Sequence, residues 1–136
     1  MIIFYYQKGN EIFERICCGF GMKIIYKNTT AKKQFCSEYK RSWRYPEQVK
    51  KKLEAAENFI ISAESLMDIA NHIPFHFEHL IGNRQNEWSI RLGNTGYRVT
   101  MIPCDDNGAE IVEGDILAKC KSIKVVEITE VSNHYE

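Results

Sequence analysis

Trp88-Ser-Ile-Arg-Leu92 and Tyr97-Arg-Val-Thr-Met101, joined by Gly93-Asn-Thr-Gly96, form the stretch of sequence that decides the fold. In both segments apolar residues alternate with polar ones, which is typical of β-strands that bury one face. The tetrapeptide between them begins and ends with glycine, and this pattern predicts a hairpin turn. If the apolar residues face a core, Arg91 and Arg98 lie together on the opposite face of an antiparallel sheet.

Further strands are predicted on either side of this hairpin. Phe75-His-Phe-Glu-His-Leu80 alternates in the same way, and Gly82-Asn83 after it marks a turn. Lys124 to Val131 is rich in valine and isoleucine and predicts the last strand of the sheet. Residues 103–122 are acidic and punctuated by glycine, so we expect an extended hairpin arm or a mobile loop there.

The chain before the hairpin predicts one short strand and then a helix. Lys23 to Tyr26 has the composition of a strand. Thr29 or Thr30 is suited to cap a helix, because a threonine hydroxyl can accept a hydrogen bond from the first turn. Aromatic residues then recur at every fourth position as far as Trp43, and we expect the helix to end there.

Two more helices are predicted after a break at Tyr45-Pro46, since proline suits the first turn of a helix. The second helix has an apolar stripe at helical spacing, formed by Val49, Leu53, Ala56, Ile60 and Ala63. Ser65 to Asp68 has the pattern of a capping box and predicts a short third helix. Pro74 requires this third helix to end before it.

This order of elements predicts an α+β domain, with an N-terminal strand and two to three helices packed on one face of a small antiparallel sheet. The 136 residues suit a single domain, and the apolar fraction of 44% is sufficient for a core. Residues 1–21 show weak periodicity and precede an ordinary-looking start at Met22-Lys23. We expect an N-terminal extension at 1–21, either a translated upstream region, which we favour, or a native arm, and a domain at 22–136.

Composition predicts a reduced, cytoplasmic protein. No apolar run approaches the roughly 20 residues of a membrane helix, and the apolar start is too short for a secretory signal. The cysteines are odd in number and form no C-x-x-C pair, so their spacing predicts neither a disulfide framework nor a zinc site. Three histidines, His72, His76 and His79, have helical spacing, but Pro74 lies among them and excludes a helical metal site.

The net charge of zero conceals two oppositely charged regions. Residues 23–52 hold ten Lys or Arg against two Glu, a balance of +8. Residues 104–136 hold eight Asp or Glu against three Lys, a balance of −5. A basic region of this kind predicts either a polyanionic or acidic partner or, as the alternative, ordinary solvated helix faces.

The motifs W-S-I-R at Trp88 to Arg91 and Y-R-V at Tyr97 to Val99, with a last strand that ends in His134, resemble the RelE/ParE toxin superfamily. Within it, the chain is most similar to the HigB-like killer proteins, and the resemblance covers residues 22–134. It implies a small ribonuclease that cuts mRNA on the ribosome and that a helix-turn-helix antitoxin silences. It also implies that the toxin contacts operator DNA only through the antitoxin. The toxin is further expected to need no cofactor and to bind no membrane.

Individual residues match the family pattern or depart from it. The family's H-x-L-K-G is matched by the stretch from His79 to Arg84, which implies that His79 is the catalytic histidine. Ile81 stands in place of the family's lysine, and Arg84 is a candidate substitute. The family ends in D-Y-H, where this chain has Ser132-Asn-His134, so the histidine is kept and the two residues before it are replaced.

Cleavage of this kind uses the ribose 2′-hydroxyl as nucleophile and needs a base, an acid and cations for the phosphorane. Histidine suits the first two roles because its pKa lies near neutrality, and arginine suits the third because it grips two phosphate oxygens. We therefore predict His79 and His134 as the acid/base pair, in either order, and Arg91 and Arg98 as the phosphate clamp. The predicted RNA contacts are Arg84, Asn133, Lys32, Lys33 and Lys50.

Two other functions stay open on this fold. A gyrase-inhibiting, ParE-like toxin would bind its target without RNA cleavage and would not need paired histidines. A catalytically decayed toxin-like protein would only bind its antitoxin, and the replacements at Ile81, Ser132 and Asn133 favour it. The basic residues 23–52 would in each case be available to an acidic antitoxin segment.

Overall fold

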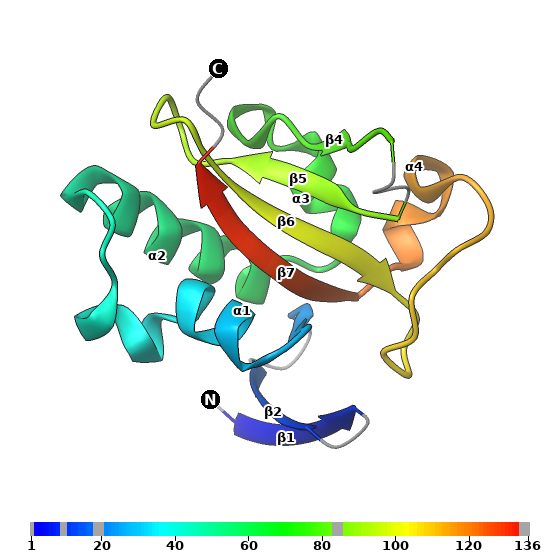
Figure 1. Ribbon diagram of the computed structural model, residues 1–136. Helices are drawn as coiled ribbons and strands as arrows, with labels where there is room; N and C mark the ends of the chain where they lie inside the picture. Colours follow the sequence, from blue (N-terminus) through cyan, green and yellow to red (C-terminus); the bar gives the residue numbers. More distant parts are fainter. Residues whose placement is uncertain (1, 9–10, 18–20, 83–85, 134–136) are drawn as a thin grey trace.

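The computed structural model describes residues 2–8, 11–17, 21–82 and 86–133, and it confirms the predicted α+β fold. Five strands form one sheet in the order β3-β7-β6-β5-β4, and two strands form a separate sheet (Figure 1). The strands are β1 (Ile2–Lys8), β2 (Glu11–Cys17), β3 (Lys23–Tyr26), β4 (Glu78–His79), β5 (Trp88–Arg91), β6 (Tyr97–Cys104) and β7 (Val125–Asn133). The helices are α1 (Thr29–Phe35), α2 (Glu47–Ser62), α3 (Leu66–Asn71) and α4 (Ile116–Lys119), with 3-10 turns η1 (Ser37–Ser42), η2 (Ile73–Phe75) and η3 (Cys120–Ser122).

The helices α1, α2 and α3 lie on one face of the five-stranded sheet, as predicted (Figure 1). The apolar stripe of α2 makes the contact, because Leu53 and Ile60 are fully buried in the same core as Ile90, Val99 and Ile128 of the sheet. Burial of this apolar surface is the main favourable term in folding, at about 25 cal/mol per Å². The apolar residues that recur at helical spacing in α2 and those that alternate along the strands therefore pack together in one core.

The five-stranded sheet is mixed, which corrects the antiparallel sheet predicted from the sequence. β3 runs parallel to β7, from Lys23 opposite Val125 to Tyr26 opposite Ile128, whereas the other three pairings are antiparallel. Parallel neighbours need a long crossover connection, and the helices with the rest of the sheet supply it. β7 therefore lies inside the sheet, and its end at Asn133 reaches the hairpin between β5 and β6.

The N-terminal strands form a hairpin of their own. β1 and β2 pair antiparallel over their full length, from Ile2 opposite Cys17 to Lys8 opposite Glu11. The chain then joins the core at Met22, which is fully buried and whose N–H donates to the carbonyl of Ala63 at 2.9 Å. The division into an extension at 1–21 and a domain at 22–136 stays a prediction.

The helix predicted to reach about Trp43 is divided at Cys36. Asn28, rather than one of the two threonines after it, caps α1, because its Oδ1 accepts a hydrogen bond from the N–H of Ala31 at 2.8 Å. Extended backbone at Cys36 then ends α1, and the chain continues as η1. Trp43, which follows η1, is buried in the core, so its ring packs against other core residues and is not available to a ligand.

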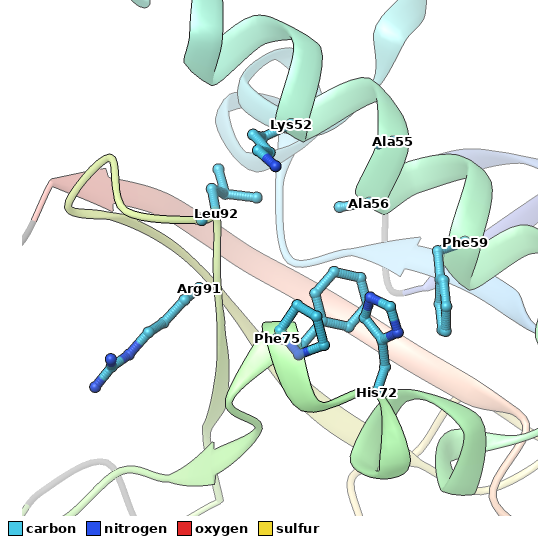
Figure 2. A pocket seen from close by; sticks show the side chains of 10 residues that line it. Lys52, Ala55, Ala56, Phe59, His72, Phe75, Arg91 and Leu92 are labelled. Carbon is cyan, nitrogen blue, oxygen red and sulfur yellow. The ribbon is translucent and has the colours of Figure 1, made fainter.

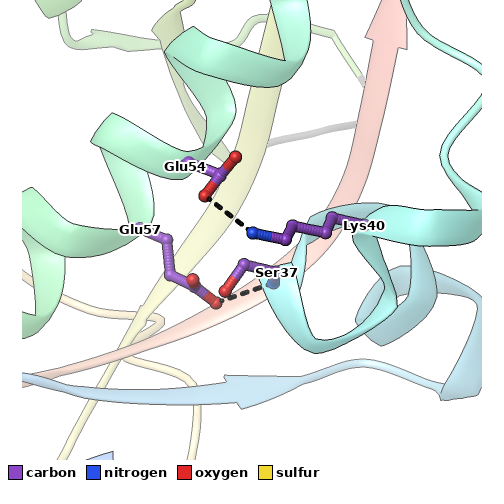
Figure 3. Close-up of polar contacts among 4 residues, drawn as sticks. All are labelled: Ser37, Lys40, Glu54 and Glu57. Carbon is purple, nitrogen blue, oxygen red and sulfur yellow. Dashed lines mark hydrogen bonds and ion pairs between the residues drawn. The ribbon is translucent and has the colours of Figure 1, made fainter.

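Two polar contacts hold η1 against α2 (Figure 3). Glu57 is only 5% exposed and accepts a hydrogen bond from the N–H of Ser37, the first residue of η1, at 3.1 Å. Nearer the solvent, Nζ of Lys40 lies 3.6 Å from Oε2 of Glu54. Exposed ion pairs contribute little and a buried, charge-assisted hydrogen bond contributes more, so Glu57 chiefly positions η1.

The strand predicted from Phe75 onward is much shorter than its alternation indicated. Ile73–Phe75 forms the 3-10 turn η2, and His76 follows in the left-handed conformation with a φ of 46°. Only Glu78 and His79 pair with β5. The pairing of β4 with β5 therefore ends at Ser89.

The sequence predicted an extended hairpin arm or a mobile loop after β6, and the structure shows a turn, a single bridge and the short helix α4 in place of an extended arm. Residues 105–108 form a turn, and Cys104 makes an isolated antiparallel bridge with Glu110. Asp115 then caps α4, since its Oδ1 accepts a hydrogen bond from the N–H of Leu117 at 3.0 Å. Local side-chain caps of this kind replace the ladder that a hairpin arm would need.

We predict that three buried cysteines, Cys36, Cys104 and Cys120, resist thiol reagents in the native protein. All three are buried, and burial raises the pKa of the Cys36 thiol from its ordinary 9.0 to about 11, so its reactive thiolate is scarce at pH 8. Because the unfolded thiol loses its proton first, the contribution of Cys36 to stability falls as the pH rises from about 9 to about 11.

The measurement is the reaction with Ellman's reagent at pH 8 in a background with Cys17→Ser and Cys18→Ser. We expect the three thiols to react fully only after unfolding in guanidinium. Rapid reaction of Cys36 in the folded protein would contradict the burial described here.

Candidate functional site

The sheet surface turned away from α1, α2 and α3 carries the two arginines that the sequence singled out. Arg91 and Arg98 are direct cross-strand partners in the β5–β6 register, so the prediction that they share a face is confirmed. We call this surface the arginine face, and it also carries Glu78, Ser89, Thr100, Glu130 and Ser132, which alternate with core residues in the paired strands.

The arginine pair is an unusual arrangement, because like charges directly opposite each other destabilise a sheet. Glu78 of β4 offsets part of this repulsion, with its Oε1 3.7 Å from Nη1 of Arg98. Arg91 is exposed, and the Arg98 side chain keeps 28% of its surface accessible. Glu78 and Glu130 on the same face balance the two arginines overall, but both guanidinium groups line a hollow at the hairpin end that has no carboxylate among its described lining residues, so an anion can bind there.

A hollow of about 250 Å³ lies beside the arginine pair, at the end of the β5–β6 hairpin. Both arginines line it, together with Gly93, Asn94, Gly96 and Tyr97. Thr95 holds the hairpin in shape, since its hydroxyl donates to the carbonyl of Leu92 at 2.7 Å and accepts from the N–H of Tyr97 at 3.2 Å. The hollow therefore has a defined floor and cationic walls.

Three hydroxyl groups on the arginine face have no hydrogen-bond partner among the described residues. They belong to Ser89, Thr100 and Ser132. Ser89 stands opposite Thr100, and Ser132 stands opposite Arg98. A buried hydroxyl without a partner costs free energy, and because these three oxygens have almost no accessible surface, a ligand on the face would not contact them directly.

His79 does not lie on the arginine face, which corrects the site predicted from the sequence. The β4–β5 register places Glu78 opposite Ser89, and therefore on the arginine face, but His79 opposite Trp88. The His79 ring stacks on Trp88, with centroids 4.7 Å apart and planes at 11°, and Trp88 belongs to the core on the helix side. The structure brings the two arginines together and leaves His79 on the other face.

If the arginine face carries the RNA cleavage that the sequence resemblance implies, we predict that His79→Ala leaves this activity nearly unchanged. The lost ring contact with Trp88 should cost about 0.5–1.5 kcal/mol of unfolding free energy, the usual range for an aromatic pair. Cleavage of mRNA should fall by less than about threefold, because a general acid or base contributes about 10²-fold or more. Urea unfolding and a cleavage assay on one preparation measure both effects, and a 10²-fold loss of cleavage would restore His79 to the site.

Two predicted site residues, His134 and Arg84, lie outside the described residues, and their roles stay predictions. Asn133 is described and is exposed at the end of β7, opposite Tyr97. Tyr97 contacts Tyr45 edge-on at 5.6 Å on the helix side of the sheet, so Asn133 shares that side. Its predicted contact with RNA would be made at the rim of the sheet rather than on the arginine face.

The predicted basic contacts lie on two different helices. Lys32 and Lys33 are in the last turn of α1, where cations also stabilise the helix dipole, and Lys32 lies over the ring of Tyr39 at 5.8 Å. Lys50, in α2, is 4.0 Å from Glu47. These contacts explain the three lysines structurally, and their predicted role in RNA binding stays a prediction.

Sequence analysis missed Lys52 as an individual site residue. Its side chain lies over the hairpin, with Cε 3.1 Å from where a Cβ on Gly93 would stand, and it lines a second cavity together with Arg91. Lys52 is the last of three consecutive lysines, and only the packing of α2 over the hairpin distinguishes it. The sequence indicated only that Lys52 lies just beside the apolar stripe of α2.

The histidines considered for a metal site are separated in the structure. His72 packs on Phe59 and Phe75, and His76 lies 3.6 Å from Oε2 of Glu78. Within the residues that the structure describes, no group of three or more His, Cys, Asp and Glu side chains is placed to hold a metal ion.

A comparison of the chain with models of protein families and with curated proteins finds no match. Among the described helices, none is both long enough and apolar enough to span a lipid bilayer. The fold and site thus define the chain as a small α+β protein that carries a cross-strand pair of arginines on one face of its sheet.

Proposed function

We propose that this protein is the toxin of a type II toxin–antitoxin pair, a cytoplasmic endoribonuclease that cleaves mRNA on the ribosome. Its partners are then the ribosome, mRNA and a helix-turn-helix antitoxin that carries it to operator DNA. The observation that carries the proposal is the direct cross-strand pairing of Arg91 with Arg98 beside a hollow. The sequence resemblance to HigB-like proteins supports the same function.

The arrangement is suited to hold a phosphodiester. Arginine keeps its charge at all relevant pH values and donates two parallel hydrogen bonds to phosphate oxygens. Two such groups on one face can neutralise the extra negative charge that builds up when the 2′-hydroxyl attacks phosphorus.

Proton transfer in this proposal depends on His134 rather than His79. His79 stacks on Trp88 on the far side of the sheet, whereas His134 directly follows the last residue of β7. One imidazole can serve the 2′-hydroxyl or the leaving 5′-oxygen, and water or a ribosomal group would serve the other. The proposed enzyme thus has a complete charge clamp and a single histidine of its own.

The test is incubation of the purified protein with ribosomes programmed with a defined mRNA, in the absence of antitoxin. We expect fragments with 2′,3′-cyclic phosphate ends, because attack by the 2′-hydroxyl produces them, and none from mRNA that is 2′-O-methylated at the cut. Intact mRNA at high protein concentration would contradict the proposed activity.

A second function, an inactive toxin-like protein that only binds its antitoxin, is favoured by one specific observation. The position of His79 removes one of the two predicted imidazoles from the arginine face. Expression without antitoxin separates the two functions, since a host would tolerate the inactive protein and its growth would be arrested by the nuclease.

A further inference from the structure

A second cavity, of about 160 Å³, opens between α2 and the β5–η2 edge of the sheet (Figure 2). Its walls are mainly apolar and come from Ala55, Phe59, His72, Phe75 and Leu92. The pairing of β4 with β5 does not extend to this point, because it ends at Ser89. The cavity is smaller than the sites that hold drug-sized ligands, and it suits a single small ring system.

Three rings form one end of this cavity. The centroids of Phe59 and His72 are 4.4 Å apart, those of His72 and Phe75 are 4.5 Å apart, and those of Phe59 and Phe75 are 4.9 Å apart. Such a cluster is fixed by its own contacts and keeps its shape without a ligand. It offers planar, polarisable surface to another flat ring.

The entrance of the cavity is cationic. Figure 2 shows the Lys52 ammonium turned toward the space between the elements, while Arg91 extends from β5 away from the rings. The described residues that line the cavity include no carboxylate. A ligand that fits both parts has a flat apolar ring and a negative charge beside it.

The cavity lies on the helix side of the sheet and adjoins the hollow at the end of the β5–β6 hairpin, because Arg91 and Gly93 line both. We propose that the cavity holds one base of the RNA whose phosphate is held by Arg91 and Arg98. The base stacks on the ring cluster, and Lys52 pairs with the phosphate next to it. This inference rests on the proposed function and adds to it a base subsite that sets the register of the RNA.

Ala55→Leu tests the subsite without removing any contact from the core. Ala55 is exposed on α2 and lines the cavity, so a leucine there fills the space while keeping a strong helix former. Asn58→Leu is the matched control, because Asn58 is exposed on the same helix and does not line the cavity. Thermal unfolding should be similar for both variants and the wild type.

Binding is measured to ribosomes programmed with an uncleavable, 2′-O-methylated mRNA, with each base of the exposed codon removed in turn. In the wild type, one abasic position should weaken binding about tenfold, within the usual range for one stacked base. Ala55→Leu should weaken binding to intact mRNA about tenfold and should be insensitive to that abasic position. Asn58→Leu should behave like the wild type.

Two results overturn the inference and are distinguishable. If the wild type binds the programmed ribosomes, Arg91→Ala weakens binding and Ala55→Leu has no effect, the base subsite is wrong and the proposed function survives. If the wild type does not bind at all, the proposed function and the subsite both fail.

Discussion

Replacing Arg91 and Arg98 together by alanine should abolish mRNA cleavage and growth arrest while the protein stays folded. Loss of one well-placed donor to a developing charge costs about 10²–10³-fold in rate, so loss of both should exceed about 10³-fold. The fold should not suffer, because the two residues are direct cross-strand partners of like charge. We expect the melting temperature to be unchanged or slightly raised.

The rate on programmed ribosomes and the melting temperature are the two measurements. Lys121→Ala is the charge-matched control, because Lys121 is exposed in η3, away from the arginine face, and its loss should leave cleavage unchanged. Arg91→Lys with Arg98→Lys should recover only part of the activity, since lysine keeps the charge but loses the two-pronged donor. Full activity of the alanine double variant would show that the arginine face is not the site.

The pairing of the two arginines was predictable from the sequence, because side chains alternate between the two faces along a β-strand. Arg91 and Arg98 are symmetric about a glycine-bounded turn, so any tight hairpin between them places them opposite each other. The same alternation predicts the observed position of His79. This residue follows Phe77 by two positions and therefore lies on the same face of the strand. The family resemblance predicted that His79 shares a site with the arginines, whereas the strand alternation places it on the other face of the sheet.

Other features could not be predicted because no local pattern carries them. Alternation is the same in parallel and antiparallel strands, so nothing in residues 23–26 indicates that β3 runs parallel to β7. Lys52 differs from its neighbours only through the crossing of α2 over the hairpin, which depends on long-range packing. The cavity on the helix side likewise depends on long-range packing, because its walls come from α2, from η2 and from the start of the β5–β6 hairpin.

Trp88→Ala should cause the largest loss of stability of any single change considered. Trp88 is 7% exposed and stacks on the rings of Phe77 and His79, each with its centroid 4.7 Å away and its plane nearly parallel to the indole. Removing a buried tryptophan typically costs about 3–5 kcal/mol. Since native domains are stable by only about 5–15 kcal/mol, much of the stability would be lost.

Urea unfolding measures this effect, with Trp88→Phe as the control that keeps a stacked ring and should cost clearly less. A loss for Trp88→Ala no larger than that for His79→Ala would show that the stack does not anchor the edge of the sheet. The stack also has a functional consequence, because β4 is only two residues long and holds Glu78 beside Arg98. Loosening β4 would remove the carboxylate that offsets the arginine pair, so Trp88→Ala should also alter the salt dependence of RNA binding, whereas Trp88→Phe should leave it nearly unchanged.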